Sequence, residues 1–182
     1  MIVSIHQPNF FPWYPFFKKM EQADVFVILT HCQFEKNGYQ NRFHHDDKWY
    51  TMSVNKGLDL IHEKTYLNYE KDWKRIKTSL KQFPIEQFDS DFGYSLWMTN
   101  TLIINRLTEI LNIRTRVVID YPTELTKSNR LVDICKRYNA TQYLAGRGSK
   151  NYMDIEPFER AGIEVIYQEV DEEDMVPIIT KL

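Results

Sequence analysis

The residues best suited to chemistry lie in a short proline-rich loop near the N-terminus. Residues 6–15 read HQPNFFPWYP and combine a histidine and two amides with three prolines. An imidazole can exchange a proton near neutral pH, so we predict that His6 acts as a general base. The neighbouring polar and aromatic side chains would bind the substrate: Gln7, Asn9 and Trp13. The alternative is that these polar groups satisfy backbone atoms while the aromatic rings fill a corner of the core.

A second candidate segment, residues 145–152, reads AGRGSKNY. Its glycines let the backbone approach a ligand, and cations near a helix N-terminus suit an anion. It lacks the spacing of a Walker A phosphate-binding loop. We predict that Lys150 stabilises negative charge and that four neighbours bind substrate: Gly146, Arg147, Ser149 and Tyr152. An ordinary strand-to-helix turn with exposed cations is the alternative.

A third polar cluster occupies residues 33–42. Side-chain amides beside an arginine can bind polar, hydroxylated or anionic ligands. We predict Arg42 as a second catalytic cation, and the cluster's other members as substrate-binding residues: Gln33, Tyr39, Gln40 and Asn41. The same residues would also serve to cap a hairpin.

Two further motifs make weaker candidates. Cys32 beside His31 suggests a covalent nucleophile, but adjacent residues of a strand point to opposite faces. The run HHDD at residues 44–47 suggests a metal site, but four consecutive residues cannot all converge on one ion. We therefore predict a solvated turn there and no metal site, and no motif indicates a particular cofactor.

The elements that must position these loops alternate between strand and helix. Apolar runs predict strands at residues 2–5, 25–29, 117–119, 142–145 and 163–167, and 3.6-residue periodicity predicts helices at 16–22, 73–83, 96–111, 129–138 and 155–161. This alternation predicts one α/β domain over residues 1–182, with a Rossmann-like, mainly parallel sheet of about five strands flanked by helices. Short β-like pieces with Asn-Gly and Lys-Gly turns predict a β-rich insertion near residues 31–68. Loops that follow parallel strands at their carboxyl ends carry ligand sites, which favours the first two segments.

Composition excludes several classes of protein. The net charge of -2 gives no bulk basic surface for nucleic acid. A mean hydropathy of -0.49 without a long apolar run argues against a membrane span. The two cysteines are too few for a disulfide scaffold, and no signal peptide is recognisable, so we expect a cytoplasmic protein. The aromatic residues, 14% of the chain, concentrate in the first 50 residues, where we interpret them as part core and part pocket wall.

The three polar segments resemble the signature motifs of the WbqC-like family. The matching stretches are IHQPNFFPW (5–13), ADVFVIL (23–29), QF (33–34), QNR (40–42), YLAG (143–146), KNY (150–152) and FERAGIEV (158–165). The sequence departs from the family at residues 30–32, where THC replaces the usual pair of acidic residues. The resemblance implies a transferase of surface-polysaccharide or O-antigen synthesis that moves an acyl or aminoacyl group, such as glycyl, to an amino sugar. Its partner would be a small amino-sugar or sugar-nucleotide substrate.

Two other functions stay open. The order of strand, proline-rich loop, helix and strand is similar to the start of HIGH-motif nucleotidylyltransferases, although WYPF at residues 13–16 replaces their histidine pair. This similarity predicts a nucleotide-dependent enzyme that activates a carboxylate. A non-catalytic module that binds a sugar nucleotide or a partner protein is the third possibility.

Overall fold

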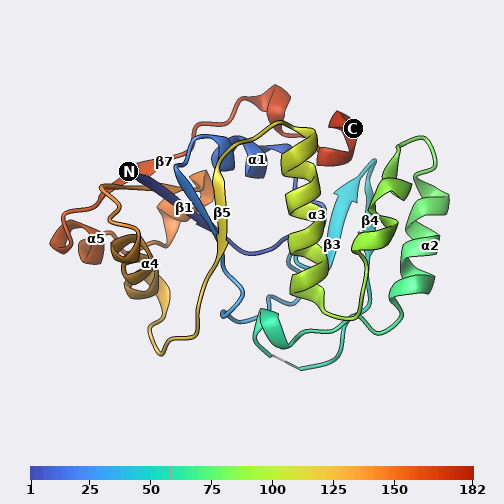
Figure 1. Cartoon of the computed structure of the whole chain (residues 1–182), viewed down its shortest axis with the longest axis horizontal. Coiled ribbons are helices and arrows are strands. Elements are labelled where there is room, and N and C mark those ends of the chain that lie inside the picture. The colour runs from blue at the N-terminus through green and yellow to red at the C-terminus, as the bar shows by residue number, and fades with distance from the viewer. Residues whose placement is uncertain (58) are drawn as a thin grey trace.

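A five-stranded parallel sheet forms the centre of the computed structural model, which describes residues 1–57 and 59–182 (Figure 1). The strand order is β5-β2-β1-β6-β7, and every neighbouring pair is parallel. The predicted α/β fold is therefore confirmed. The strands are β1 (Ile2–His6), β2 (Val25–Ile28), β5 (Arg116–Ile119), β6 (Gln142–Ala145) and β7 (Glu164–Tyr167).

The helices lie close to the residue ranges that apolar periodicity predicts. The first begins at residue 14 instead of 16, because Pro15 fits the first turn of a helix, where its missing N–H costs nothing. Gly162 follows the last α-helix with a φ of 68°, the left-handed conformation expected of a helix-ending glycine. The helices are α1 (Tyr14–Glu21), α2 (Tyr69–Ser79), α3 (Leu96–Ile110), α4 (Lys127–Arg137) and α5 (Glu156–Arg160), and the 3-10 helices are η1 (Ile61–Glu63), η2 (Ile85–Asp91), η3 (Arg147–Asn151), η4 (Glu172–Asp174) and η5 (Ile178–Lys181).

The sheet is buried on both faces. Along β2, Phe26 and Ile28 join one apolar core with residues of α1 and α3. Val25 and Val27 point the other way, into a core built with α4 and α5. Figure 1 shows α3 on one side of the sheet and α4 with α5 on the other. Burial on two faces explains why these strands are continuous apolar runs.

The predicted β-rich insertion contains one hairpin, of β3 (Arg42–His45) and β4 (Lys48–Thr51). Its turn is formed by Asp46 and Asp47, both exposed and both with positive φ, as a two-residue hairpin turn requires. Residues 65–67, one of the short β-like pieces of this insertion, form only isolated bridges, and the N–H of Tyr66 bonds to a loop carbonyl, that of Tyr94. Within residues 1–57 and 59–182, no group of three or more potential ligands could hold a metal ion, and no helix could cross a membrane.

The strand order creates a crevice at one place in the sheet. From β1 the chain passes to β2 on one side, whereas β6 pairs with β1 on the other side. Connections that leave in opposite directions open a gap between the loops at the carboxyl ends of the two strands. The loops that follow β1 and β6 are the two that the sequence marks as polar. The fold therefore brings the proline-rich loop and the AGRGSKNY loop to one edge of the sheet.

Candidate functional site

A cavity of about 470 Å³ lies at this crevice. Its walls come from the end of β1, the first turns of α1, the loop after β6 and the segment after β7. The lining residues are Ile5, His6, Trp13, Pro15, Phe16, Lys19, Tyr143, Gly146, Arg147, Gly148, Ser149, Tyr152, Gln168, Val170 and Met175. Six of the predicted site residues meet here: His6, Trp13, Gly146, Arg147, Ser149 and Tyr152.

His6 presents one ring nitrogen that can accept a proton. Its Nδ1 lies 3.0 Å from the carbonyl oxygen of Gln7, so Nδ1 carries the hydrogen and Nε2 has the lone pair. The ring packs edge-on against Phe16, with 4.8 Å between the ring centroids. Burial, and then the charge of Lys19, lower the pKa of His6 to about 3. The imidazole is therefore neutral at pH 7.

Lys19 is a site residue that the sequence analysis did not single out. Its side chain is on α1 and the residue is only 3% exposed. Nζ donates a hydrogen bond to the carbonyl oxygen of Ile5 at 3.0 Å, and none of the ion pairs of the described residues involves Lys19. Burial without a carboxylate lowers the pKa of Lys19 to about 7. One feature of the sequence could have identified Lys19: it lies three residues after Phe16, on the apolar stripe of a predicted helix.

His6 and Lys19 together form a proton-accepting pair in the cavity. Two positive charges side by side in a buried site repel, so the pair takes up its first proton well before its second. Because the pKa of Lys19 is about 7 and that of His6 is about 3, Lys19 takes the first proton and His6 stays neutral. A pKa near 7 is the value at which a group both accepts and returns protons efficiently at neutral pH. The cavity therefore contains a base matched to that pH.

The loop after β6 contributes a cation. Arg147, at the start of η3, is exposed and lines the cavity. Ser149 holds the loop through its hydroxyl, which donates to the carbonyl oxygen of Gly146 at 2.7 Å. Lys150 is not among the lining residues, and its ammonium lies over the ring of Tyr167, 4.8 Å from the centroid. The arrangement favours Arg147 over Lys150 as the cation that faces a ligand.

The third predicted segment lies apart from this cavity. The guanidinium of Arg42 stacks on Trp49 at 3.9 Å and donates to the carbonyl oxygens of Gly38 and Asn37. Its neighbours are tied to the insertion in similar ways. Asn41 donates to the Met52 carbonyl oxygen, Gln40 donates to the side chain of Gln7, and Gln33 forms a bridge with Leu60. Asn9 and Tyr39 line a smaller, adjoining cavity.

Comparison with known proteins places the chain in a family. The profile of the WbqC-like protein family matches residues 7–175, which include every cavity-lining residue except Ile5 and His6. The chain belongs to the WbqC-like protein family. One relative, the uncharacterized protein Rv1507c of Mycobacterium tuberculosis, is 26% identical over 93% of this chain and 82% of its own length. No solved structure matches.

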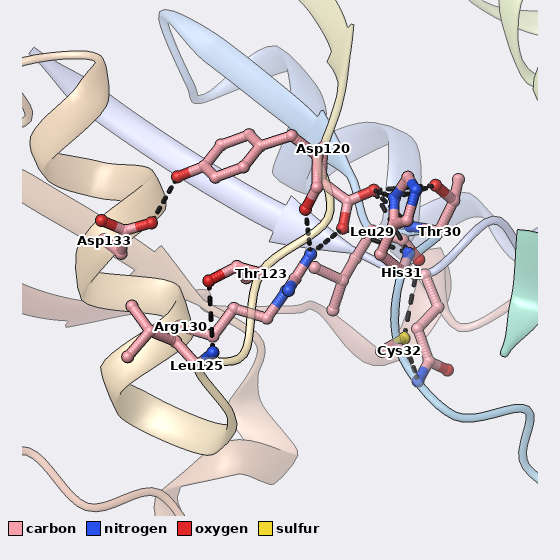
Figure 2. A network of polar contacts seen from close by, with 11 residues as sticks. Leu29, Thr30, His31, Cys32, Asp120, Thr123, Leu125, Arg130 and Asp133 are labelled. Carbon is pink, nitrogen blue, oxygen red and sulfur yellow. Dashed lines mark hydrogen bonds and ion pairs between the residues drawn. The ribbon is translucent and has the colours of Figure 1, made fainter.

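In this WbqC-like chain a polar network connects residues 30–31 to the buried Asp120 and to Arg130 (Figure 2). Asp120, just after β5, accepts hydrogen bonds from the backbone N–H and the hydroxyl of Thr30, at 2.7 and 2.8 Å. It also pairs with Nδ1 of His31 at 3.1 Å and with the guanidinium of Arg130 on α4. These contacts join the ends of β2 and β5 to α4. None of these residues lines the cavity, and we expect the network to stabilise the fold.

Cys32 is not activated by His31 in this WbqC-like protein. Its sulfur contacts Nε2 of Gln7 at 3.5 Å and the Leu29 carbonyl oxygen at 3.6 Å, whereas the His31 ring faces Asp120 (Figure 2). The His31 ring also packs at a tilt against the ring of His62, with 4.3 Å between their centroids. Burial raises the pKa of the Cys32 thiol to about 11. A reactive cysteine has a lowered pKa. The geometry thus disfavours Cys32 as the nucleophile.

We expect Cys32 to be alkylated slowly by iodoacetamide at pH 8. A pKa of about 11 in place of the ordinary 9.0 leaves roughly one hundredth of the usual thiolate fraction, and the thiolate is the nucleophile. A Cys135→Ser variant isolates the signal, and mass spectrometry follows labelling in buffer and in urea. Labelling in buffer as fast as in urea would show an accessible, unperturbed thiol.

Proposed function

We propose that this protein transfers an acyl or aminoacyl group to the amine of an amino sugar during assembly of a bacterial surface glycan. The observation that carries the proposal is the Lys19–His6 pair, which lines a cavity at the crevice where parallel sheets bind ligands and whose lysine is buried. Membership of the WbqC-like family supports it, through the resemblance to proteins suspected of such transfers.

The proposed step needs a base and a group that stabilises negative charge. The sugar amine attacks the carbonyl carbon of the donor, a C–N bond forms, and the carbonyl oxygen becomes negative. Lys19, neutral for about half of the molecules at pH 7, takes the proton that the attacking nitrogen loses. Arg147 lies at the same cavity and would stabilise the oxyanion. The bond to the leaving group then breaks, and that group departs with the electron pair and a proton from Lys19.

In this scheme His6 orients the acceptor amine. Its Nε2 has a lone pair but little affinity for a proton, so it accepts a hydrogen bond and leaves the proton transfer to Lys19. A His6→Ala substitution is expected to lower kcat about tenfold, the effect of one lost hydrogen bond. It should also shift the rising limb of the pH–rate profile to higher pH, because water that enters the cavity raises the pKa of Lys19. A loss of about 10²–10⁴ with the limb unmoved would instead make His6 the base.

A donor and acceptor screen tests the function itself. Thermal-shift measurements with acyl-CoAs, ATP plus amino acids, and amino-sugar nucleotides identify ligands, and mass spectrometry then detects the acylated sugar. A ligand at one hundred times its Kd stabilises the fold by about 2.7 kcal/mol. ATP-dependent release of pyrophosphate would favour the nucleotide-dependent alternative. Stabilisation by a sugar nucleotide without turnover by any donor would favour the non-catalytic module.

A further inference from the structure

A second, smaller hollow lies beside the cavity, along the proline-rich loop. Its volume is about 230 Å³, and it shares Trp13 and Met175 with the first cavity. One wall is the proline-rich loop, another is the hairpin region with Tyr39 and His44, and the third is the segment after η4. The two hollows adjoin at the shared residues, and the smaller one is called the outer groove below.

The outer groove has a composition suited to uncharged, hydroxylated ligands. It is lined by Asn9, Phe10, Phe11, Pro12, Trp13, Tyr39, Phe43, His44, Met175, Val176 and Pro177, which include no lysine, arginine, aspartate or glutamate. Trp13 and Tyr39 are 46% and 54% exposed, so their rings are open to a ligand. An aromatic side chain combines a flat apolar face with a polar edge, the surface that the C–H face of a sugar ring covers.

Asn9 supplies a polar group at the outer groove. The residue is 7% exposed and lines this hollow. A side-chain amide can donate two hydrogen bonds and accept two, so it can bind the hydroxyl groups of a sugar.

The outer groove is held rigidly by the fold. The N–H of Phe10 donates to the Tyr39 carbonyl oxygen at 2.8 Å, and Asn100 on α3 donates to the Pro8 carbonyl oxygen at 2.7 Å. The wall formed by the segment after η4 is attached to α1 by a hydrogen bond: the N–H of Tyr14 donates to the Val176 carbonyl oxygen at 2.9 Å. In Figure 1 the C-terminal segment runs beside α1 toward the hairpin. A preformed groove loses little entropy on binding.

We propose that the outer groove binds the sugar units next to the reacting amino sugar, so that the acceptor is an oligosaccharide and not a monosaccharide. The proposal rests on the proposed function, which places the amino sugar in the adjoining cavity. The absence of lysine and arginine from the lining disfavours a phosphate or nucleotide, and the exposed rings of Trp13 and Tyr39 beside the Asn9 amide favour a neutral glycan.

Isothermal titration with one monosaccharide and two tetrasaccharides tests the proposal. The probes are methyl glucosaminide and tetrasaccharides of one glucosamine and three N-acetylglucosamine units, prepared with the free amine at either end. We expect one tetrasaccharide to bind at least tenfold more tightly than the monosaccharide. Tyr39→Ala and Asn9→Ala should remove most of that advantage and leave monosaccharide binding unchanged. Tyr94→Ala removes another exposed tyrosine that lines neither hollow, and it should have no effect.

The outcomes separate this proposal from the proposed function. Equal affinity for both sugars, no binding of either, or an equal loss of both in Tyr39→Ala would overturn the outer groove as a glycan site. Length-dependent binding without transfer by any donor would leave the groove in place and reject the transferase. Dimerisation in sedimentation experiments that Tyr39→Ala abolishes would show that a second copy of the chain occupies the groove, and would overturn the proposal.

Discussion

Replacing Lys19 by methionine is expected to lower kcat by about 10²–10⁴, the usual contribution of a general base. Methionine keeps an unbranched chain of similar length in the buried space but cannot accept a proton. The wild-type rate should rise with pH through about 7, because only the deprotonated amine acts as a base, and should level off above that pH. The Lys19→Met variant should lack this limb. Steady-state kinetics between pH 5 and 9 provide the measurement.

Two further variants separate chemistry from structure. Lys18→Met changes the neighbouring lysine, which lies over the ring of Tyr14 and does not line the cavity, so it should keep full activity. Lys19→Arg keeps a cation that can bond to the Ile5 carbonyl oxygen but stays protonated at every accessible pH. Recovery of the rate by Lys19→Arg would show that Lys19 serves as a fixed charge and would contradict its role as a base.

The same lysine can be probed without knowing the substrate. At pH 7 an amine with a pKa of about 7 is half neutral, whereas an ordinary lysine is neutral in only about one molecule in several thousand. We therefore expect brief treatment with a small acylating reagent to modify Lys19 before Lys18, as read by peptide mass spectrometry. Preferential modification of Lys18 would mean that the Lys19 amine is either protonated or closed to the cavity.

The largest effect on stability is expected from Asp120→Ala, a loss of about 3–5 kcal/mol in the free energy of unfolding. The substitution leaves the buried guanidinium of Arg130 without its carboxylate and removes the acceptor for Thr30 and His31. Urea denaturation measures the change, and Asp171→Ala, at an exposed position, is the control with an expected effect under about 0.5 kcal/mol. A loss of less than about 1 kcal/mol would show that the network contributes little.

The same network predicts a dependence of stability on acid. Burial alone would raise the pKa of Asp120, but the hydrogen bonds from Thr30, His31 and Arg130 outweigh it and lower the pKa below its ordinary value. The stabilisation is therefore complete above the unfolded-state pKa of about 3.9 and disappears as the pH falls through the lower folded-state value. An Asp120→Asn variant should lose less stability than the wild type over that interval.

Much of the fold could be read from the sequence, because apolar periodicity reports burial directly. The strand at 142–145 was predicted at its observed bounds, and the strand predicted at 25–29 ends one residue earlier, at Ile28. The secondary structure of the insertion was harder to predict. Residues 65–67 have strand-like composition, but their backbone groups bond to loops, and no local pattern encodes such partners.

The candidate site was predicted in part. The proline-rich loop and the loop after β6 were marked by residue type, and their residues line one cavity. Arg42 and Lys150 were expected beside them, but both cations lie on aromatic rings instead, Trp49 and Tyr167. Stacking partners distant in sequence cannot be recognised from one chain alone. The catalytic roles of the cavity residues stay predictions.

Local patterns in the sequence were sufficient to locate the strands, the helices and the polar loops, because these properties depend on neighbours a few residues away. Which loops meet depends on how the strands pair across the chain. Pairing β6 with β1 sets the crevice between their loops and leaves the 33–42 segment outside the larger cavity. The tertiary structure also identifies Lys19 as a candidate base. The pKa of its amine is lowered by desolvation, and the residues that bury the amine come from distant parts of the chain.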